Sequence, residues 1–325
     1  MPIIDASEGG APDGRLPVQH VVVDDDSGGQ RLDNLLFRIV KGVPKTHIYR
    51  VIRTGAVRVN KRRASAETRV AAGDVVRIPP LRRAPESDTT HIPGREFPVL
   101  LEDAWLLAVD KPAGVAVHGG SGVSFGVIEQ LRRARPELRT LELVHRLDRA
   151  TSGVLLLAKK RSALRTLQAQ FRERQIRKTY LALVLGEWPE RLKVLDQPLA
   201  RYLLPSGERR VKVVAATDPN AMRALTLVRV RTRWPGFTLL EVTLKTGRTH
   251  QIRVHLSAQG FPIAGDDKYG LFERNKSLGK NGLKRMFLHA WKMQCTHPAT
   301  AQTVWLEAPL PADLPLPPDF GTNTG

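Results

Sequence analysis

The sequence has almost no cysteine: Cys295 is the only one among 325 residues. A single thiol excludes an internal disulfide framework, and it excludes a zinc or iron–sulfur site built from several cysteines. It is typical of a protein in a reducing compartment, so we expect a cytoplasmic location.

Long apolar runs are also missing. Stretches such as 154–158 hold only a few apolar residues, whereas a helix that crosses a bilayer needs about 20. Residues 1–17 lack the pattern of a signal peptide, so we expect no membrane insertion.

Both ends are rich in glycine or proline. We therefore expect a disordered tail at 1–17 and a Pro-rich extended tail at 311–325.

Acidic residues are scarce relative to basic ones. The chain has 51 lysines and arginines against 32 aspartates and glutamates, which gives a net charge of +19. This excess favours a polyanionic partner, either nucleic acid or an anionic membrane surface. Residues 30–83 hold 14 of the basic residues and only three acidic ones. That segment is the first candidate binding element.

Residues 30–80 predict a small module of two helices and a few short strands. Leu32, Leu35, Leu36 and Ile39 fall on one face of the first helix, and Pro44 suits the first turn of the second. Strands are predicted at 57–60 and around 75–77. Outward basic side chains would contact phosphates without reading sequence. These residues are Lys45, Arg50, Arg53, Arg58, Lys61, Arg62 and Arg63.

The same segment resembles the S4 RNA-binding domain, an αL-type module. The resemblance lies in R-L-D at 31–33, V-x-V-N-x-x-R at 57–63 and A-G-D-x-V at 72–76. It implies an S4-like domain over residues 18–83. The following stretch, 84–96, lacks apolar periodicity and is predicted to be a linker.

Residues 97–310 predict a second, larger domain. Helical patterns fall at 124–134 and 161–173. Many strands with few helices indicate an α+β domain with a largely antiparallel or mixed central sheet flanked by helices. The predicted strands are 99–101, 106–110, 153–158, 180–184, 224–231, 238–244 and 251–255.

Two other motifs in this domain suggest different chemistries. His118-Gly119-Gly120 and the G-x-S-x-G match at 122–126 look like parts of a serine hydrolase. They are adjacent and no strand precedes Ser124, so a hydrolase is disfavoured and Ser124 could instead cap the next helix. His250 and His255 would face opposite sides of the predicted strand 251–255. No metal site and no cofactor site is predicted.

The segment 144–153, V-H-R-L-D-R-A-T-S-G, places one acid among basic and hydroxyl residues. From the residues alone, Asp148 could be an ion-paired loop residue or a catalytic carboxylate. The pattern H-R-L-D-x-x-T-S-G resembles the signature loop of pseudouridine synthases of the RluA type. Other blocks of that family agree in order, and the resemblance covers residues 20–310. These blocks are D-K-P-A-G at 110–114, K-T-Y at 178–180, G-R-T-H-Q-I-R-V-H at 247–255, G-D-D-K-Y-G at 265–270 and L-H-A at 288–290.

The resemblance implies an isomerase that converts uridine into pseudouridine without a cofactor. Asp148 would be the catalytic carboxylate, as a nucleophile at C1′ or C6 or as a base at the sugar. Tyr180 would stack on the target base, and Arg253 would pair with Asp148. A stacked uridine must first be flipped out of the RNA, at a cost of a few kcal/mol. Arg146 would fill the gap that the flipped base leaves in the RNA. Arg248 and His250 would also contact the RNA near the site.

Several stretches, including 41–45, 116–122 and 141–145, resemble the C-type, large-subunit branch of the family most. This implies 23S rRNA, or a large-subunit assembly intermediate, as partner of a monomeric enzyme that binds no membrane. It implies uridines 955, 2504 and 2580 of that RNA as targets. Two alternatives stay open: a non-catalytic RNA-binding assembly factor on the same fold, and a basic membrane-surface protein, which would need an amphipathic helix with exposed aromatic residues.

Overall fold

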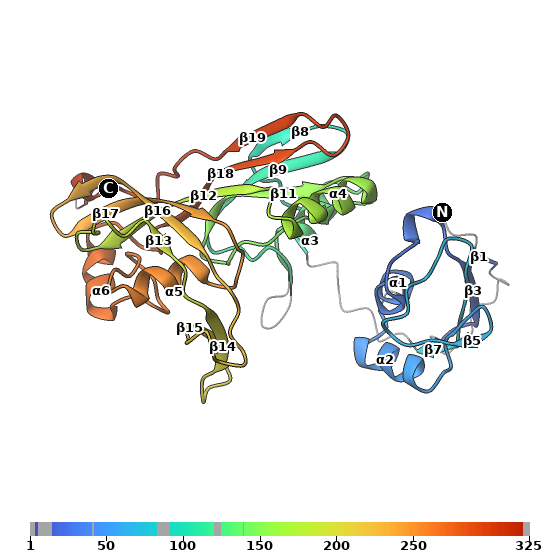
Figure 1. The fold of residues 1–325 in the computed structure, drawn as a ribbon. Helices are drawn as coiled ribbons and strands as arrows, with labels where there is room; N and C mark the ends of the chain where they lie inside the picture. The colour runs from blue at the N-terminus through green and yellow to red at the C-terminus, as the bar shows by residue number, and fades with distance from the viewer. Residues whose placement is uncertain are drawn as a thin grey trace. The chain divides into compact units, whose positions relative to one another are not determined.

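The structure, a computed structural model, describes residues 4–5, 15–40, 42–82, 92–119, 125–138 and 140–320. The chain divides into two compact units, residues 1–91 and 92–325, whose elements are labelled in Figure 1. The predicted linker at 84–96 spans this division, and its residues 84–91 lie outside the described part of the chain.

The first unit is a five-stranded antiparallel sheet in the order β1-β3-β6-β4-β5, with two helices packed on one face. Successive residues of a strand point to opposite faces. Val21 and Val76 are buried against the helices, whereas their neighbours His20 and Arg77 are exposed. The elements are β1 (Ile4–Asp5), β2 (Arg15–Leu16), β3 (Gln19–Val22), η1 (Asp25–Ser27), α1 (Leu32–Ile39), α2 (Lys45–Arg53), β4 (Arg58–Val59), β5 (Arg62–Arg63), β6 (Val75–Ile78) and β7 (Leu81–Arg82).

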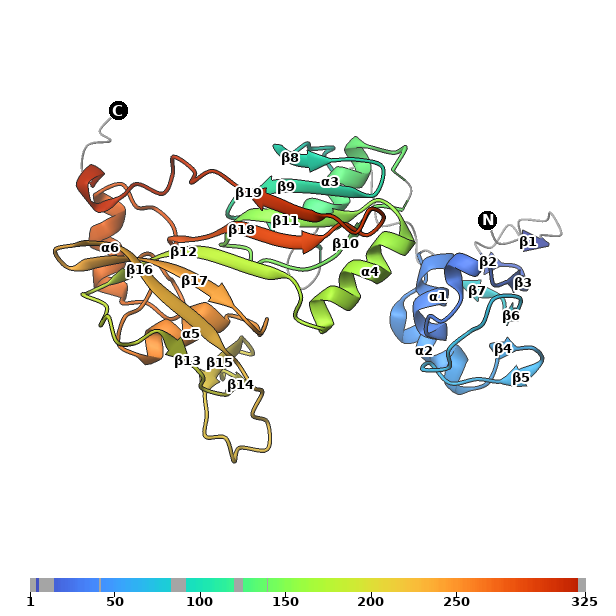
Figure 2. The ribbon, with the colours of Figure 1, turned by 45° about the horizontal axis from the view of Figure 1, so that its top comes forward.

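The second unit is built on a ten-stranded mixed sheet, seen from a second direction in Figure 2. Its main path runs β13-β16-β17-β12-β18-β11-β9-β8, and only the pair β11 and β18 is parallel among the described strands. The strands are β8 (Val99–Glu102), β9 (Leu106–Lys111), β10 (Glu142–Leu143), β11 (Ser152–Ala158), β12 (Arg177–Leu185), β13 (Val194–Leu195), β14 (Leu199–Leu203), β15 (Arg209–Val213), β16 (Thr226–Trp234), β17 (Phe237–Leu244), β18 (Leu288–Thr296) and β19 (Thr303–Glu307). The helices are α3 (Val127–Ala134), α4 (Arg161–Arg172), α5 (Gln251–Ala258), α6 (Phe272–Lys280) and the 3-10 turn η3 (Pro317–Asp319).

Helices cover both faces of the sheet. Leu155 and Leu157 of β11 pack in one core cluster with residues of α3, while Leu156 and Ala158 pack in another with residues of α4. A strand that is buried on both faces has an apolar residue at nearly every position. This explains why the run at 154–158 shows no alternation.

Helix α5 replaces the strand that the sequence predicted at 251–255, so that prediction was wrong. All residues from 251 to 256 are buried, and a helix that is buried all round shows no apolar stripe of period 3.6. Ile252, Val254 and Leu256 alternate with other residues instead, which imitates a strand. His250 precedes the helix in a left-handed conformation, with φ of 52°. Arg253 therefore projects from a helix.

The ends of the chain also differ from the prediction. Within the predicted disordered tail at 1–17, β1 pairs with β3 and β2 pairs with β7; residues 1–3 and 6–14 lie outside the described part. Within the predicted extended tail, Leu314 is buried, and Leu316 and Phe320 pack against the main core. Apolar residues spaced among the prolines dock this segment, which composition alone did not reveal.

Some elements were not predicted, among them the hairpin β14–β15, helix α6 and the pair β18–β19. Helix α3 begins at Val127, with Gly126 as its N-cap, so the predicted start at 124 was too early. Ser124 itself lies outside the described residues.

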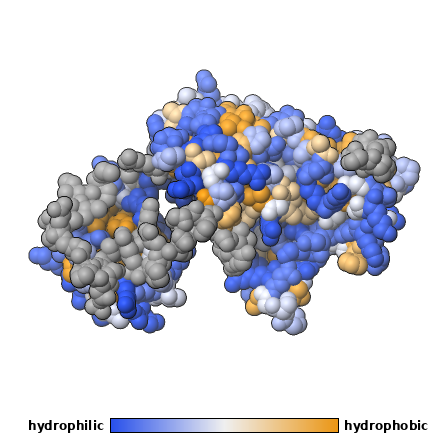
Figure 3. Space-filling view, turned by 180° about the vertical axis from the view of Figure 1, so that it is seen from behind, coloured by the Kyte–Doolittle hydropathy of each residue, from blue (hydrophilic) through white to orange (hydrophobic). Residues whose placement is uncertain are grey.

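The face of the molecule in Figure 3 is mainly hydrophilic. No helix among the described residues is long and apolar enough to cross a membrane.

Candidate active site

A cavity of about 570 Å³ lies in the second unit, where three segments meet. The loop between β10 and β11 contributes Asp148, strand β12 contributes Tyr180, and helix α5 contributes Arg253. Its volume is in the range of sites that hold small molecules, about 300–1,000 Å³. Three further predicted residues line the same cavity: Arg146, Arg248 and His250.

The loop that carries Asp148 is fixed by a buried lysine. Nζ of Lys111, at the end of β9, donates hydrogen bonds to two carbonyl oxygens of the turn at 112–115 and, at 3.3 Å, to the carbonyl oxygen of Arg149. The Arg149 carbonyl also accepts the N–H of Gly114 at 2.8 Å. Burial lowers the pKa of Lys111 to about 7. The backbone beside Asp148 is thus held by donors from outside its own loop.

The same loop ends at a close approach of two strands. Ser152 and Gly153 of β11 pair in parallel with His289 and Ala290 of β18, and Ser152 Oγ lies 2.9 Å from His289 Nδ1. Gly153 has φ of 109°, and a Cβ there would lie 2.2 Å from the Ala290 carbonyl oxygen. Only glycine satisfies both conditions. The sequence T-S-G therefore fixes where the loop that carries Asp148 enters the sheet.

Tyr180 lies at an irregularity of the sheet. The register between β12 and β18 shifts between Thr179 and Leu181, and such bulges re-aim a side chain next to a site. The Tyr180 side chain lines the cavity but is otherwise buried. Burial and the negative charge of Asp148 raise the pKa of the Tyr180 hydroxyl. It therefore stays protonated at neutral pH and can donate a hydrogen bond.

Arg253 is held by a second aspartate. Its Nε donates to Asp266 Oδ2 at 2.7 Å and its Nη2 to Asp266 Oδ1 at 2.6 Å, and both side chains are buried. Burial by itself lowers the pKa of Arg253, but the hydrogen bonds and charge of Asp266 raise it overall. Asp266 also accepts the backbone N–H groups of Lys268 and Tyr269. This bidentate pair fixes the plane of the guanidinium.

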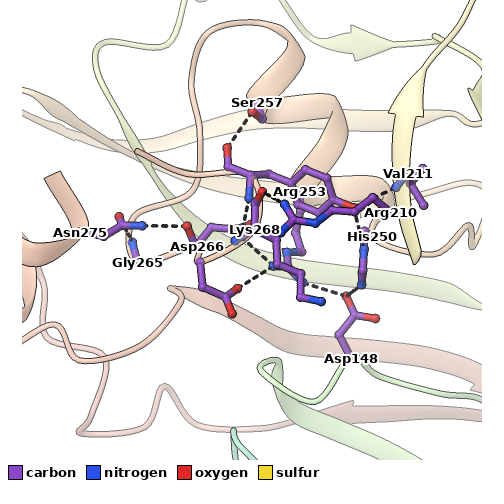
Figure 4. A network of polar contacts seen from close by, with 12 residues as sticks. Asp148, Arg210, Val211, His250, Arg253, Ser257, Gly265, Asp266, Lys268 and Asn275 are labelled. Carbon is purple, nitrogen blue, oxygen red and sulfur yellow. Dashed lines mark hydrogen bonds and ion pairs between the residues drawn. The ribbon is translucent and has the colours of Figure 1, made fainter. Parts of the chain in front are cut away.

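The Asp148 carboxylate faces two nitrogen atoms from α5 and the residue before it (Figure 4). Its Oδ2 lies 3.9 Å from Arg253 Nη1 and 3.9 Å from His250 Nε2. Both distances are longer than a hydrogen bond. The side chain of Asp148 is 31% exposed. The carboxylate is therefore attracted by a fixed cation and remains open to a molecule in the cavity.

His250 is oriented by a tyrosine. Its Nδ1 lies 2.8 Å from the Tyr269 hydroxyl, which accepts the N–H of Val211 on β15. The hydroxyl can then donate its own proton to Nδ1, and in that arrangement the imidazole proton lies on Nε2. Burial lowers the pKa of His250, and Asp148 acts in the opposite direction. The imidazole is therefore neutral at neutral pH, and its Nε2 lies 3.9 Å from the Asp148 carboxylate.

The structure separates the predicted residues into two groups. Six of them, those named above for the cavity, lie together in the second unit, and the other seven, at 45–63, lie in the first unit. The predicted G-x-S-x-G segment lies outside the described residues except for Phe125 and Gly126. Among the described residues, no three His, Cys, Asp or Glu side chains converge as a metal site would require.

Several residues of the site were not singled out from the sequence. Lys111, Asp266 and Tyr269 lie in blocks that carried the resemblance, but nothing in their spacing showed which partner each would contact. Lys178, in the K-T-Y block, lines the cavity as well. Burial lowers the pKa of its ammonium group. A cation at this wall suits a phosphate of a bound nucleotide.

Comparisons of the sequence with known proteins identify its family. A family described as RNA pseudouridylate synthase matches residues 105–258, and the S4 domain family matches residues 30–76. The chain is 48% identical over 307 residues to "Ribosomal large subunit pseudouridine synthase C" of Vibrio vulnificus, covering 92% of this chain and 95% of that protein. It is 49% identical over 305 residues to the protein of that name from Escherichia coli (strain K12), covering 91% and 94%.

Solved structures agree with the fold of the second unit. "Human RNA Pseudouridylate Synthase Domain Containing 4" superposes with a TM-score of 0.55 at 29% identity, over 67% of this chain and 90% of that one. "Human RNA Pseudouridylate Synthase Domain Containing 1" gives 0.55 at 27% identity, over 66% and 84%.

Proposed function

The chain belongs to the RNA pseudouridylate synthase family and carries an S4 domain, and from this we propose that it isomerises uridines of large-subunit ribosomal RNA at the cavity around Asp148. The observation that carries the proposal is the meeting of Asp148, Tyr180 and Arg253 in one cavity. Two relatives that are almost half identical over nine-tenths of the chain are named for this RNA subunit.

The reaction needs the groups that the cavity contains. The N1–C1′ bond of uridine breaks, the base turns, and a C5–C1′ bond forms. The proton on C5 is removed and N1 regains one, so the product is an isomer and no oxidant or group donor is consumed. A carboxylate can assist as a nucleophile at C1′ or C6, or as a base at the sugar. In each case Asp148 must reach the nucleoside in its ionised form.

The surrounding residues place a cation near the carboxylate and offer a surface for the base. Arg253 presents a fixed positive charge to Asp148, and His250 Nε2 lies at the same 3.9 Å distance from the carboxylate. The ring of Tyr180 and the side chains of Leu244 and Leu288 offer apolar surface to a base within the same cavity. Arg146 lines the cavity and is exposed, which supports a role in occupying the gap that a flipped uridine leaves in the RNA.

The experiment is pseudouridine mapping by carbodiimide adducts and primer extension on large-subunit RNA. The RNA is treated with the wild-type protein, with Asp148→Ala, or with Glu187→Gln, a control that removes an exposed carboxylate outside the cavity. We expect stops with wild type and the control only, with 955, 2504 and 2580 as the positions implied by the branch resemblance. RNA binding without stops, on naked RNA and on assembly intermediates, would instead support the non-catalytic assembly factor.

A further inference from the structure

We infer that the open face of the first unit's sheet, formed by β3, β6, β4 and β5, is a binding surface for RNA phosphates, distinct from helix α2. This rests on the proposed RNA substrate and deepens it by placing a second contact region. The surface is defined by His20, Arg58, Lys61, Arg63 and Arg77, and we call it the sheet face. The helices pack on the opposite face of the same sheet.

The strand register aligns four of these residues, three of them arginines, in one row. His20 lies opposite Arg77, Arg77 opposite Arg58, and Arg58 opposite Arg63. Neighbouring strands are about 4.8 Å apart, so the row spans about 14 Å across the sheet. Like charges directly opposite each other on neighbouring strands destabilise a sheet. The row is therefore unfavourable for folding unless a negative ligand offsets it.

In the second unit, basic residues on neighbouring strands lie opposite acidic ones. On its strands Arg229 lies opposite Glu241 and forms an ion pair at 3.0 Å, and Lys292 lies opposite Glu307 and forms one at 3.2 Å. Elsewhere among the described strands and bridges, cations face one another only in the first unit, at Arg15–Arg82 and Arg31–Arg69. On the sheet face, no ion pair with a described acidic residue is formed by any of its five members.

A hollow runs along this row. It encloses about 730 Å³ and is lined by His20, Arg58, Lys61 and Arg77, with Val75 as an exposed apolar residue and Asn60 at its side. Arg77 donates one hydrogen bond to the carbonyl oxygen of Ala56 at 3.1 Å, which orients its guanidinium. Basic walls with a small apolar floor suit a nucleic-acid backbone, whose phosphates accept hydrogen bonds while the riboses contact apolar atoms.

The test is the salt dependence of RNA binding by the full-length chain. The variant Arg58→Gln, Lys61→Gln, Arg77→Gln is compared with wild type on a transcript of large-subunit RNA by fluorescence anisotropy. Each lost phosphate contact lowers the slope of log K against log salt by about 0.7–0.9. We therefore expect the slope to fall by about two to three. A slope equal to that of wild type would overturn the inference.

The matched control removes three exposed cations from α6: Arg274→Gln, Lys276→Gln, Lys280→Gln. It changes the net charge equally, so an equal loss in the control would show that only total charge matters and would overturn the sheet-face assignment. Arg77→Gln also removes the bond to Ala56. The double variant Arg58→Gln, Lys61→Gln leaves that bond in place, and we expect its slope to fall by about 1.5.

The outcome separates this inference from the proposed function. If wild type forms pseudouridine on the transcript while the sheet-face variant keeps the wild-type slope, only the inference fails. If wild type neither binds the transcript nor modifies it, the proposed function fails. Wild-type binding to vesicles with anionic lipid that is lost in the variant, without any change in RNA binding, would assign the sheet face to a membrane and overturn the inference.

Discussion

The cavity of the second unit and the sheet face of the first use charge in opposite ways. In the cavity Arg253 is held by acidic partners: its Nη2 lies 2.6 Å from Asp266 Oδ1, and its Nη1 lies 3.9 Å from Asp148 Oδ2. In the first unit Arg58 lies beside Arg77, and neither forms an ion pair with a described acidic residue. A charge that takes part in chemistry must be fixed, and burying it requires partners. A charge that attracts a polyanion needs only to be exposed and close to others of its sign.

The largest expected effect comes from the one carboxylate that the cavity leaves open. Asp148→Ala should reduce pseudouridine formation by about 10⁴-fold or more, as removal of a catalytic nucleophile commonly does, while RNA affinity stays near that of wild type. Single-turnover assays and anisotropy measure the two quantities on the same RNA. Retained turnover would remove Asp148 from the mechanism, and equal losses of both would mark it as a binding residue.

Pseudouridine formation should depend nearly as strongly on the cation that faces Asp148. Arg253→Met removes the fixed cation and should reduce turnover by about 10²-fold or more, with a smaller loss of RNA affinity. Comparable losses in the two would identify Arg253 as a phosphate contact instead.

Asp266→Asn leaves the Arg253 guanidinium without its buried carboxylate partner. Breaking a buried pair in this way costs about 3–5 kcal/mol of unfolding free energy. Urea denaturation of the variant measures that cost, with Asp267→Asn as the control, because Asp267 also contacts Arg253 but is 75% exposed. A loss no greater than that of the control would show that Asp266 does not hold Arg253 in place.

Burial of Lys111 should appear as a pH dependence of stability. Its folded pKa of about 7 lies below the unfolded value near 10.5, so between these values the unfolded chain holds a proton that the folded chain lacks. Wild type should therefore gain stability relative to Lys111→Met as the pH rises from 7, by at most about 1.4 kcal/mol per pH unit. Denaturation of both proteins at pH 7, 8 and 9 measures this difference. If the unfolding free energies of the two proteins change in parallel with pH, the pKa of Lys111 is not lowered by burial.

The smallest effects should come from the exposed cations of α2. Lys45→Gln, Arg50→Gln and Arg53→Gln, singly, should each weaken RNA binding a few-fold and lower the salt slope by about 0.7–0.9. Their effects should add, because exposed charges that share no partner act independently. Strong non-additivity would show that the first unit, like the cavity, works through a coupled network.

The elements best predicted from the sequence are those with a periodic spacing of apolar residues. The helix at α1 shows a one-sided apolar stripe, and that stripe is the face the structure buries. Helix α5 shows none, because its neighbours bury it on every side. Asp148 could be chosen because its loop matched a known signature. Asp266 could not be assigned a partner, since the contact with Arg253 arises only when the loop after α5 folds back onto the helix.

The parallel pairing of β11 with β18 has a consequence for how the protein is made. Ser152 and Gly153 pair with His289 and Ala290, which are 137 residues further along the chain. Contacts so distant in sequence form late, since a long loop must close first. During synthesis the segment with Asp148 leaves the ribosome well before its partner strand. The nascent chain therefore cannot complete the loop that carries Asp148 until β18 has been synthesised, whereas its S4 domain is made well before that point.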